Sequence, residues 1–195
     1  MGKILHMFTV LNVMCIAIGM PLSNNMTACP STPAQRNINI DELVGKWYLA
    51  SLLFHEPVEN VNVIEEEAAC MKTDFTKVNS TFMSQVWAIH SPTRNTRMVF
   101  ELPTVLDHPG SWIVTSPLGV PFHVTVIQVL PRSHMVLVFC AGENTLQYLW
   151  TAILTRKTKL TRFDTMLSSI ITGYGFDFTE QLPIWHYCLP AATQD

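Results

Sequence analysis

The stretch NIDELVGKWYLASLL, from Asn39 to Leu53, decides the fold. A polar Asn-Ile-Asp-Glu segment leads to Gly45, one spacer residue and Trp47, and a β-rich apolar run follows. Glycine permits a tight turn, and tryptophan has a large apolar ring that proteins tend to bury. The pattern therefore predicts a strand that begins with a large buried ring, and the rest of the chain has to explain why.

Between Gly45 and Arg156 the sequence has no long helical period but a series of short β-rich runs. Residues typical of turns, such as Pro, Gly, Asn and Asp, separate them. Short connections favour an up-and-down antiparallel barrel, and a β-sandwich is the alternative. The eight runs are Lys46–Leu53, Cys70–Lys77, Thr81–Ile89, Thr96–Leu102, Ser111–Thr115, Phe122–Val129, His134–Cys140 and Thr145–Thr155.

After Arg156 the periodicity changes to that of an amphipathic helix. The helix is predicted over about 161–173, where Thr161 can cap its start and Gly173 can end it. Its apolar stripe is expected to pack against the outside of the barrel. The stripe consists of Phe163, Met166, Leu167, Ile170 and Ile171. We expect one domain over 20–195, with the barrel at about 45–156 and a C-terminal segment at 174–195.

The first 19 residues have the features of a secretory signal peptide. Lys3 precedes an apolar run, Met7 to Ile18, that is too short to span a bilayer and ends in Ala17-Ile18-Gly19. A buried N-terminal helix is the alternative. Cleavage after residue 19 removes Lys3 and changes the formal net charge from −3 to −4, which gives no sign of nucleic-acid binding. The sequence thus predicts a secreted protein.

The cysteines and sequons agree with an extracellular location. Cys15 leaves with the signal peptide, and an even number remains: Cys29, Cys70, Cys140 and Cys188. Four cysteines allow three disulfide pairings, and their spacing does not choose among them. None of them belongs to a metal-binding pattern. Asn25 and Asn79 each begin an Asn-x-Thr sequon and are predicted glycosylation sites.

The order of these features resembles the lipocalins, most closely the group of apolipoprotein D, the insect bilin-binding proteins and the Lazarillo-like proteins. The resemblance rests on Cys29-Pro30 with Asn37, on Gly45-x-Trp47-Tyr48, on the strand Met135 to Cys140, and on Ile153-Leu154-Thr155-Arg156 before a helix. One departure is the turn motif Thr-Asp-Tyr, in whose place Val129-Leu130-Pro131 stands. Inferences about partners that depend on that motif are therefore not transferred.

The resemblance implies roles for several residues. Trp47 would close the bottom of the barrel beneath Arg156, with Gly45 allowing the tight turn below it. Guanidinium–indole stacking would stabilise this plug. The resemblance also implies one disulfide pairing, Cys29 with Cys140 and Cys70 with Cys188.

Alternation along each strand, combined with the family pattern, predicts the residues that line the barrel. On the third strand, Met83, Gln85 and Trp87 are preferred over Phe82, Ser84 and Val86. The predicted ligand-binding positions are Leu49, Ser51, Met71, Thr73, Phe75, Gln85, Trp87, Trp150, Ala152 and Leu154. Such a lining suits an apolar ligand with one polar end, although the same residues would also fill a solid core.

The resemblance therefore implies a secreted carrier for a small hydrophobic molecule: a lipid, fatty acid, retinoid, sterol or bilin. No cofactor is required. The alternative is an extracellular signalling or adhesion module of the Lazarillo type. An enzyme is disfavoured, because all four mature cysteines match cystine positions and no catalytic grouping is recognisable. The apolar Leu52-Leu53-Phe54, expected to be exposed at the open end, makes a receptor or a membrane a candidate partner there.

Overall fold

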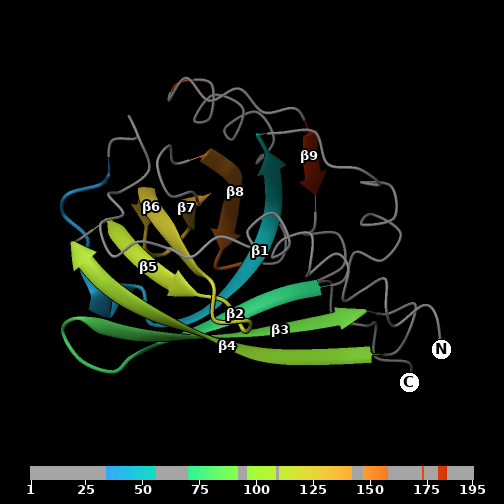
Figure 1. Ribbon diagram of the computed structural model, residues 1–195, viewed down its shortest axis with the longest axis horizontal. Helices are drawn as coiled ribbons and strands as arrows, with labels where there is room; N and C mark the ends of the chain where they lie inside the picture. The colour runs from blue at the N-terminus through green and yellow to red at the C-terminus, as the bar shows by residue number, and fades with distance from the viewer. Residues whose placement is uncertain are drawn as a thin grey trace.

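The computed structural model describes residues 34–55, 70–91, 96–108, 110–141, 147–157, 173 and 180–183. This part of the chain consists almost entirely of β-strands (Figure 1). Its elements are η1 (Ile40–Glu42), β1 (Gly45–Phe54), β2 (Cys70–Lys77), β3 (Phe82–Ser91), β4 (Thr96–His108), β5 (Ser111–Thr115), β6 (Pro121–Leu130), β7 (His134–Ala141), β8 (Gln147–Thr155) and β9 (Glu180–Pro183).

The strands form one antiparallel sheet that closes on itself. Its order is β2-β3-β4-β5-β6-β7-β8-β1-β9, and an additional pairing between β2 and β1 closes β1 to β8 into a barrel. Closure leaves no free edge between the first and last barrel strands, as an up-and-down barrel requires. The predicted eight-stranded antiparallel barrel is confirmed, and the sandwich alternative is wrong.

β1 holds the sheet together by having different partners along its length. Residues 45–48 pair with β2, whereas residues 51–54 pair with β9 on the same side of the strand. Residues 48–54 pair with β8 on the other side. Figure 1 shows β9 beside the far end of β1. The C-terminal segment thus contributes β9, a strand that the sequence does not predict because it is only four residues long.

The predicted strand boundaries are largely correct. β2 and β5 have the predicted limits, but β4 continues to His108, six residues beyond the expected end at Leu102. The residues beyond Leu102 still pair with β3 and then with β5, and a register shift near Asp107 accommodates the turn. Of the predicted helix over 161–173, only Gly173 is described, and it is helical. The signal peptide, Asn25, Cys29 and Cys188 lie outside the described residues.

The two sides of the barrel wall differ in their exposure to solvent. The outer face of β1, β7 and β8 is buried, as Leu53, Val138 and Ile153 show. On β3 and β4 the outward-facing Val86, Val99 and Val105 are between 38% and 55% exposed. One side of the barrel is therefore covered and the opposite side faces water.

The N-terminal arm completes the sheet where β5 is too short. The Gln35 backbone N–H donates to the Val126 carbonyl at 2.9 Å, and the Gln35 side-chain Oε1 accepts from the Val129 N–H at 2.5 Å. The backbone N–H and the side-chain carbonyl of Gln35 thus make the hydrogen bonds that a neighbouring strand would make along this edge of β6. A Cβ on Gly110 would lie 2.6 Å from the Gln35 carbonyl oxygen, so only glycine leaves room for the arm there.

Candidate functional site: the barrel interior and its closed end

The closed end of the barrel is built around Trp47. Its ring is fully buried, and its Nε1 donates a 2.7 Å hydrogen bond to the Leu43 carbonyl in the segment before β1. The guanidinium carbon of Arg156 lies 3.8 Å from the centroid of the Trp47 ring, as the resemblance implied. Stacking of this kind combines cation–π attraction with burial of the indole face.

Arg156 also ties together three separate segments of the chain. Its Nε donates to the Pro131 carbonyl at 2.9 Å, its Nη1 to Lys46 at 3.0 Å and its Nη2 to Glu42 at 2.8 Å. Burial lowers the pKa of the Arg156 guanidinium, while the nearby Asp74 acts in the opposite direction. Arginine suits this geometry because its planar guanidinium directs separate N–H donors at the three carbonyls. The ammonium group of lysine is a single compact point and could not reach all three.

Gly45 occupies the position that the opening motif predicted. Its φ is +97°, a left-handed value that favours glycine, and a Cβ there would lie 3.5 Å from Arg156 Nη1. The glycine thus turns the chain from η1 into β1 directly beside the guanidinium. This explains why the strand begins with Gly-x-Trp.

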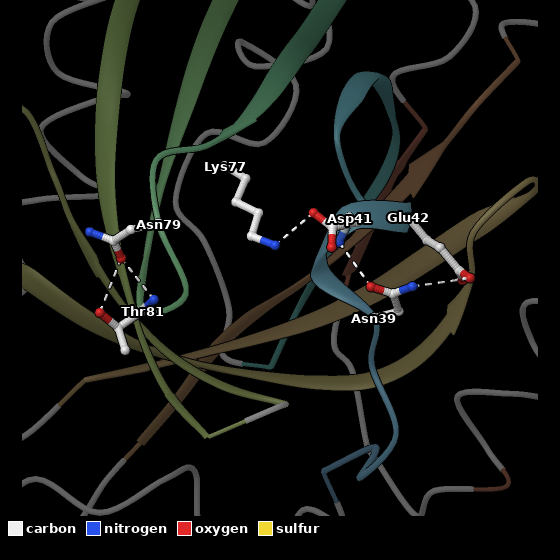
Figure 2. Close-up of polar contacts among 6 residues, drawn as sticks. All are labelled: Asn39, Asp41, Glu42, Lys77, Asn79 and Thr81. Carbon is white, nitrogen blue, oxygen red and sulfur yellow. Dashed lines mark hydrogen bonds and ion pairs between the residues drawn. The ribbon is translucent and has the colours of Figure 1, made fainter.

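The η1 segment is held to the barrel by polar contacts (Figure 2). The Asn39 side chain caps η1 by accepting from the Asp41 N–H at 3.1 Å. Asp41 forms a 2.7 Å ion pair with Lys77 at the end of β2. Exposed ion pairs contribute little stability, so this contact orients η1 rather than carrying the fold.

Most of the predicted lining positions face the barrel interior. Leu49, Phe75, Trp87, Ala152 and Leu154 belong to the buried core cluster, and Met71 and Trp150 are half-buried against it. Thr73 and Gln85 are buried at register positions opposite core residues. On β3 the preferred parity is correct, because Met83 and Trp87 are core residues whereas Val86 is 38% exposed. Contact of these residues with a ligand remains a prediction.

The prediction that Ser51 faces inward is wrong. A bulge in β1 shifts the register between Leu49 and Ser51, so that Ser51 lies opposite Ile153, a buried residue outside the interior cluster. A bulge places two residues where one is expected and reverses the alternation beyond it. As a result Leu52 and Phe54, which the strict alternation missed, belong to the interior cluster.

The same segment corrects the expectation of an exposed apolar stretch at the open end. Leu52, Leu53 and Phe54 are exposed by 4%, 0% and 5%. Leu52 and Phe54 point into the barrel, and Leu53 lies on its covered outer face. These residues therefore offer no surface for a receptor or a membrane.

Two aromatic groups lie at different levels of the interior. Near the closed end, Phe75 lies 6.4 Å from Trp47 and 6.4 Å, edge-on, from Trp112. Towards the open end, Trp150 stacks on Phe139 at 5.1 Å and meets Phe122 edge-on at 5.5 Å. The interior is thus aromatic both at the closed end and towards the mouth.

A small set of polar groups interrupts this apolar lining. Trp87 Nε1 donates to Gln85 Oε1 at 3.2 Å, and Gln85 Nε2 donates to Thr104 Oγ1 at 2.9 Å. The Thr104 hydroxyl donates in turn to the Leu102 carbonyl. Two other buried interior atoms, Thr73 Oγ1 and Trp112 Nε1, have no hydrogen-bond partner in the described part of the chain.

The cysteines and one sequon are partly described. Cys70 and Cys140 are both disulfide-bonded, but the pairing with Cys188 and Cys29 remains a prediction. Asn79 lies in the exposed turn between β2 and β3 (Figure 2), where its Oδ1 accepts from the Thr81 N–H at 2.8 Å. Asn79 is an exposed residue, and attachment of a glycan to its Nδ2 remains a prediction.

Within the described ranges, no cluster of three or more His, Cys, Asp or Glu side chains could hold a metal ion. The same ranges contain no helix long and apolar enough to cross a membrane. A depression outside the barrel, below the plug, is lined by Glu42, Leu130, Pro131, Arg132, Ser133 and Arg156. It adjoins the plug and is separate from the interior. No protein-family model matches the chain, and no curated protein matches it significantly.

Proposed function

We propose that this protein is a secreted carrier that holds a small hydrophobic molecule, such as a lipid, retinoid, sterol or bilin, inside its barrel. The observation that carries the proposal is the interior of a closed eight-stranded barrel, lined by aliphatic and aromatic side chains with a few polar groups. Barrels of this size accommodate at most one small ligand, and binding pockets have this mixed character.

The arrangement of the two ends supports a carrier with one entrance. Arg156 and Trp47 seal the end at which β1 begins, so a ligand would enter from the opposite end. There the aromatic group of Trp150, Phe139 and Phe122 would form the first apolar wall that a ligand meets. Aromatic surfaces bind apolar and polycyclic molecules well because they offer large, flat contact areas.

Secretion and kinship with the lipocalins are parts of the same proposal. The apolar leader over residues 1–19 and the disulfide-bonded Cys70 and Cys140 favour an oxidising compartment. The Gly45-x-Trp47 start with Arg156 on the Trp47 ring favours the lipocalin family.

The first test uses protein secreted from eukaryotic cells and purified without detergent. Its absorption spectrum and mass spectrometry of its organic extract should reveal a stoichiometric lipid, retinoid or bilin. A titration with the neutral fluorescent probe N-phenyl-1-naphthylamine follows if the protein is empty. Failure of both measurements would refute the carrier and favour a filled barrel, and with it the signalling alternative.

A pair of variants then locates the site. Ala152→Phe places a ring in the interior, whereas Val86→Phe places the same ring on the exposed outer face of β3. We expect A152F to abolish binding and V86F to bind like the wild type, with circular dichroism confirming that both are folded. Equal binding by the two variants would place the ligand outside the barrel.

A further inference from the structure

Two polar atoms inside the barrel are buried and have no hydrogen-bond partner among the residues that the structure describes. Thr73 is 1% exposed and Trp112 is fully buried, and neither Thr73 Oγ1 nor Trp112 Nε1 is bonded to a described protein group. An unpaired buried polar atom is costly, and native proteins contain few of them. Each such atom is therefore a candidate contact for a molecule that binds there.

Both residues face the interior. Thr73 lies opposite Trp47 on β1 and opposite Trp87 on β3, and Trp112 lies opposite Leu106 and Val124. These four neighbours all belong to the interior cluster. Phe75 connects the two sites, because it follows Thr73 by two residues on the same face and meets the Trp112 ring edge-on at 6.4 Å.

The surroundings distinguish these two atoms from the other polar groups of the interior. The indole N–H groups of Trp47 and Trp87 are already used, by the Leu43 carbonyl and by Gln85. Gln85 and Thr104 are bonded to each other. Among the buried side-chain atoms of the interior that the structure describes, only Thr73 Oγ1 and Trp112 Nε1 have no hydrogen-bond partner.

The chemistry of the two atoms specifies the ligand group. An indole N–H donates only, so its partner must be an acceptor, while a threonine hydroxyl both donates and accepts. Above the plug, the described inward-facing positions carry no lysine or arginine to pair with an anion. Burial of an ionised carboxylate without such a partner is far more costly than burial of a neutral oxygen.

We infer that the barrel selects hydrophobic molecules that carry a neutral oxygen function, a hydroxyl or carbonyl, at the end that enters first. The oxygen accepts from Trp112 Nε1 or bonds the Thr73 hydroxyl, while the apolar body lies against the wall above Phe75. This inference rests on the proposed carrier function and narrows its ligand class to alcohols, aldehydes and ketones over fatty-acid anions.

The test compares decan-1-ol, decan-2-one, decane and decanoate as competitors of the fluorescent probe N-phenyl-1-naphthylamine at pH 7.5. Their tails are alike and their polar ends differ. We expect the alcohol and the ketone to bind about tenfold more tightly than decane, equivalent to about 1.4 kcal/mol, and decanoate to bind more weakly than either.

Three substitutions assign the effect to its residues. Thr73→Val and Trp112→Phe should reduce the preference for decan-1-ol over decane to roughly twofold. Thr125→Val removes an equally buried hydroxyl on the outer face of β6 that has no partner among the described residues, and it should leave the preference unchanged. Circular dichroism of each variant verifies the barrel before titration.

The outcomes separate the two proposals. Binding of decane and decan-1-ol with equal affinity, or an unchanged preference in both interior variants, overturns the inference and leaves the carrier function standing. Tighter binding of decanoate also overturns it. Displacement of the probe by none of the four compounds, or no binding of the probe itself, counts against the carrier function.

Discussion

Replacement of Arg156 by lysine tests whether the closed end depends on the guanidinium fork or only on its charge. Arginine makes three hydrogen bonds to backbone carbonyls and stacks on the Trp47 ring at 3.8 Å. Two of these carbonyls, at Glu42 and Lys46, are bonded at solvent-exposed positions, so water can replace the lost donors there. The bond to Pro131 is partly buried and is harder to replace.

The expected magnitude follows from these contacts. A net value of about 1 kcal/mol for the partly buried bond, with about half that for each exposed one, gives about 2 kcal/mol. The stacking adds about 1 kcal/mol. Lysine keeps the charge and recovers one bond, so we expect R156K to lower the free energy of unfolding by about 2 kcal/mol.

Urea unfolding followed by tryptophan fluorescence measures this loss, because unfolding exposes the buried Trp47, Trp87 and Trp112 to water. Arg132→Lys is the matched control, since Arg132 is an exposed arginine at the same end of the barrel. R132K should unfold like the wild type. A midpoint for R156K that equals that of R132K would refute the argument that the three-carbonyl fork stabilises the closed end.

Three further predictions address other parts of the fold. Gly45→Ala should lower the free energy of unfolding by about 1–2 kcal/mol, because alanine strains a backbone at φ +97°, and an unchanged urea midpoint would contradict this. Gly110→Ala should displace the N-terminal arm and speed hydrogen exchange of the Val129 amide, and full protection at Val129 would show that the arm tolerates the methyl group. Burial lowers the pKa values of His123 and His134, so the stability that their neutral forms provide is complete above about pH 6.5 and declines as the pH falls below it. Urea unfolding at pH 7.5 and pH 5 should show this decline in the wild type and a smaller one in the double variant His123→Gln/His134→Gln. An equal loss of unfolding free energy in both proteins would argue against the histidines.

The sequence was sufficient for the barrel because its signals are local and repeated. Each strand is recognisable by its β-rich composition between turn residues. An error in one strand boundary does not change the prediction of the other strands. The predicted end of β4 at Leu102 is wrong: Pro103, the next residue, is disfavoured within strands, yet it pairs with Ser84 and the strand continues into its pairing with β5. Tertiary pairing overrides local preference at such positions.

The lining was predictable only as far as the period of two persists. Thr73 and Phe75 follow it, because β2 pairs with β3 without a register shift. Ser51 does not, because nothing in Leu49-Ala50-Ser51 marks the bulge: the stretch contains no glycine or proline. The bulge is a property of the pairing between β1 and β8, which a single sequence does not display.

The bulge also explains how one strand serves both the plug and the wall. Before it, Trp47 and Leu49 face inward, with Trp47 beneath the guanidinium of Arg156. Without the extra residue, the same parity would turn Ser51 and Leu53 inward and send Leu52 and Phe54 to the outer face. The register shift instead puts Leu52 and Phe54 on the interior, and it leaves Ser51 and Leu53 on the outer face of the strand. The ring of Phe54 thus lies in the interior near the open end, where the proposed hydrophobic ligand would be held.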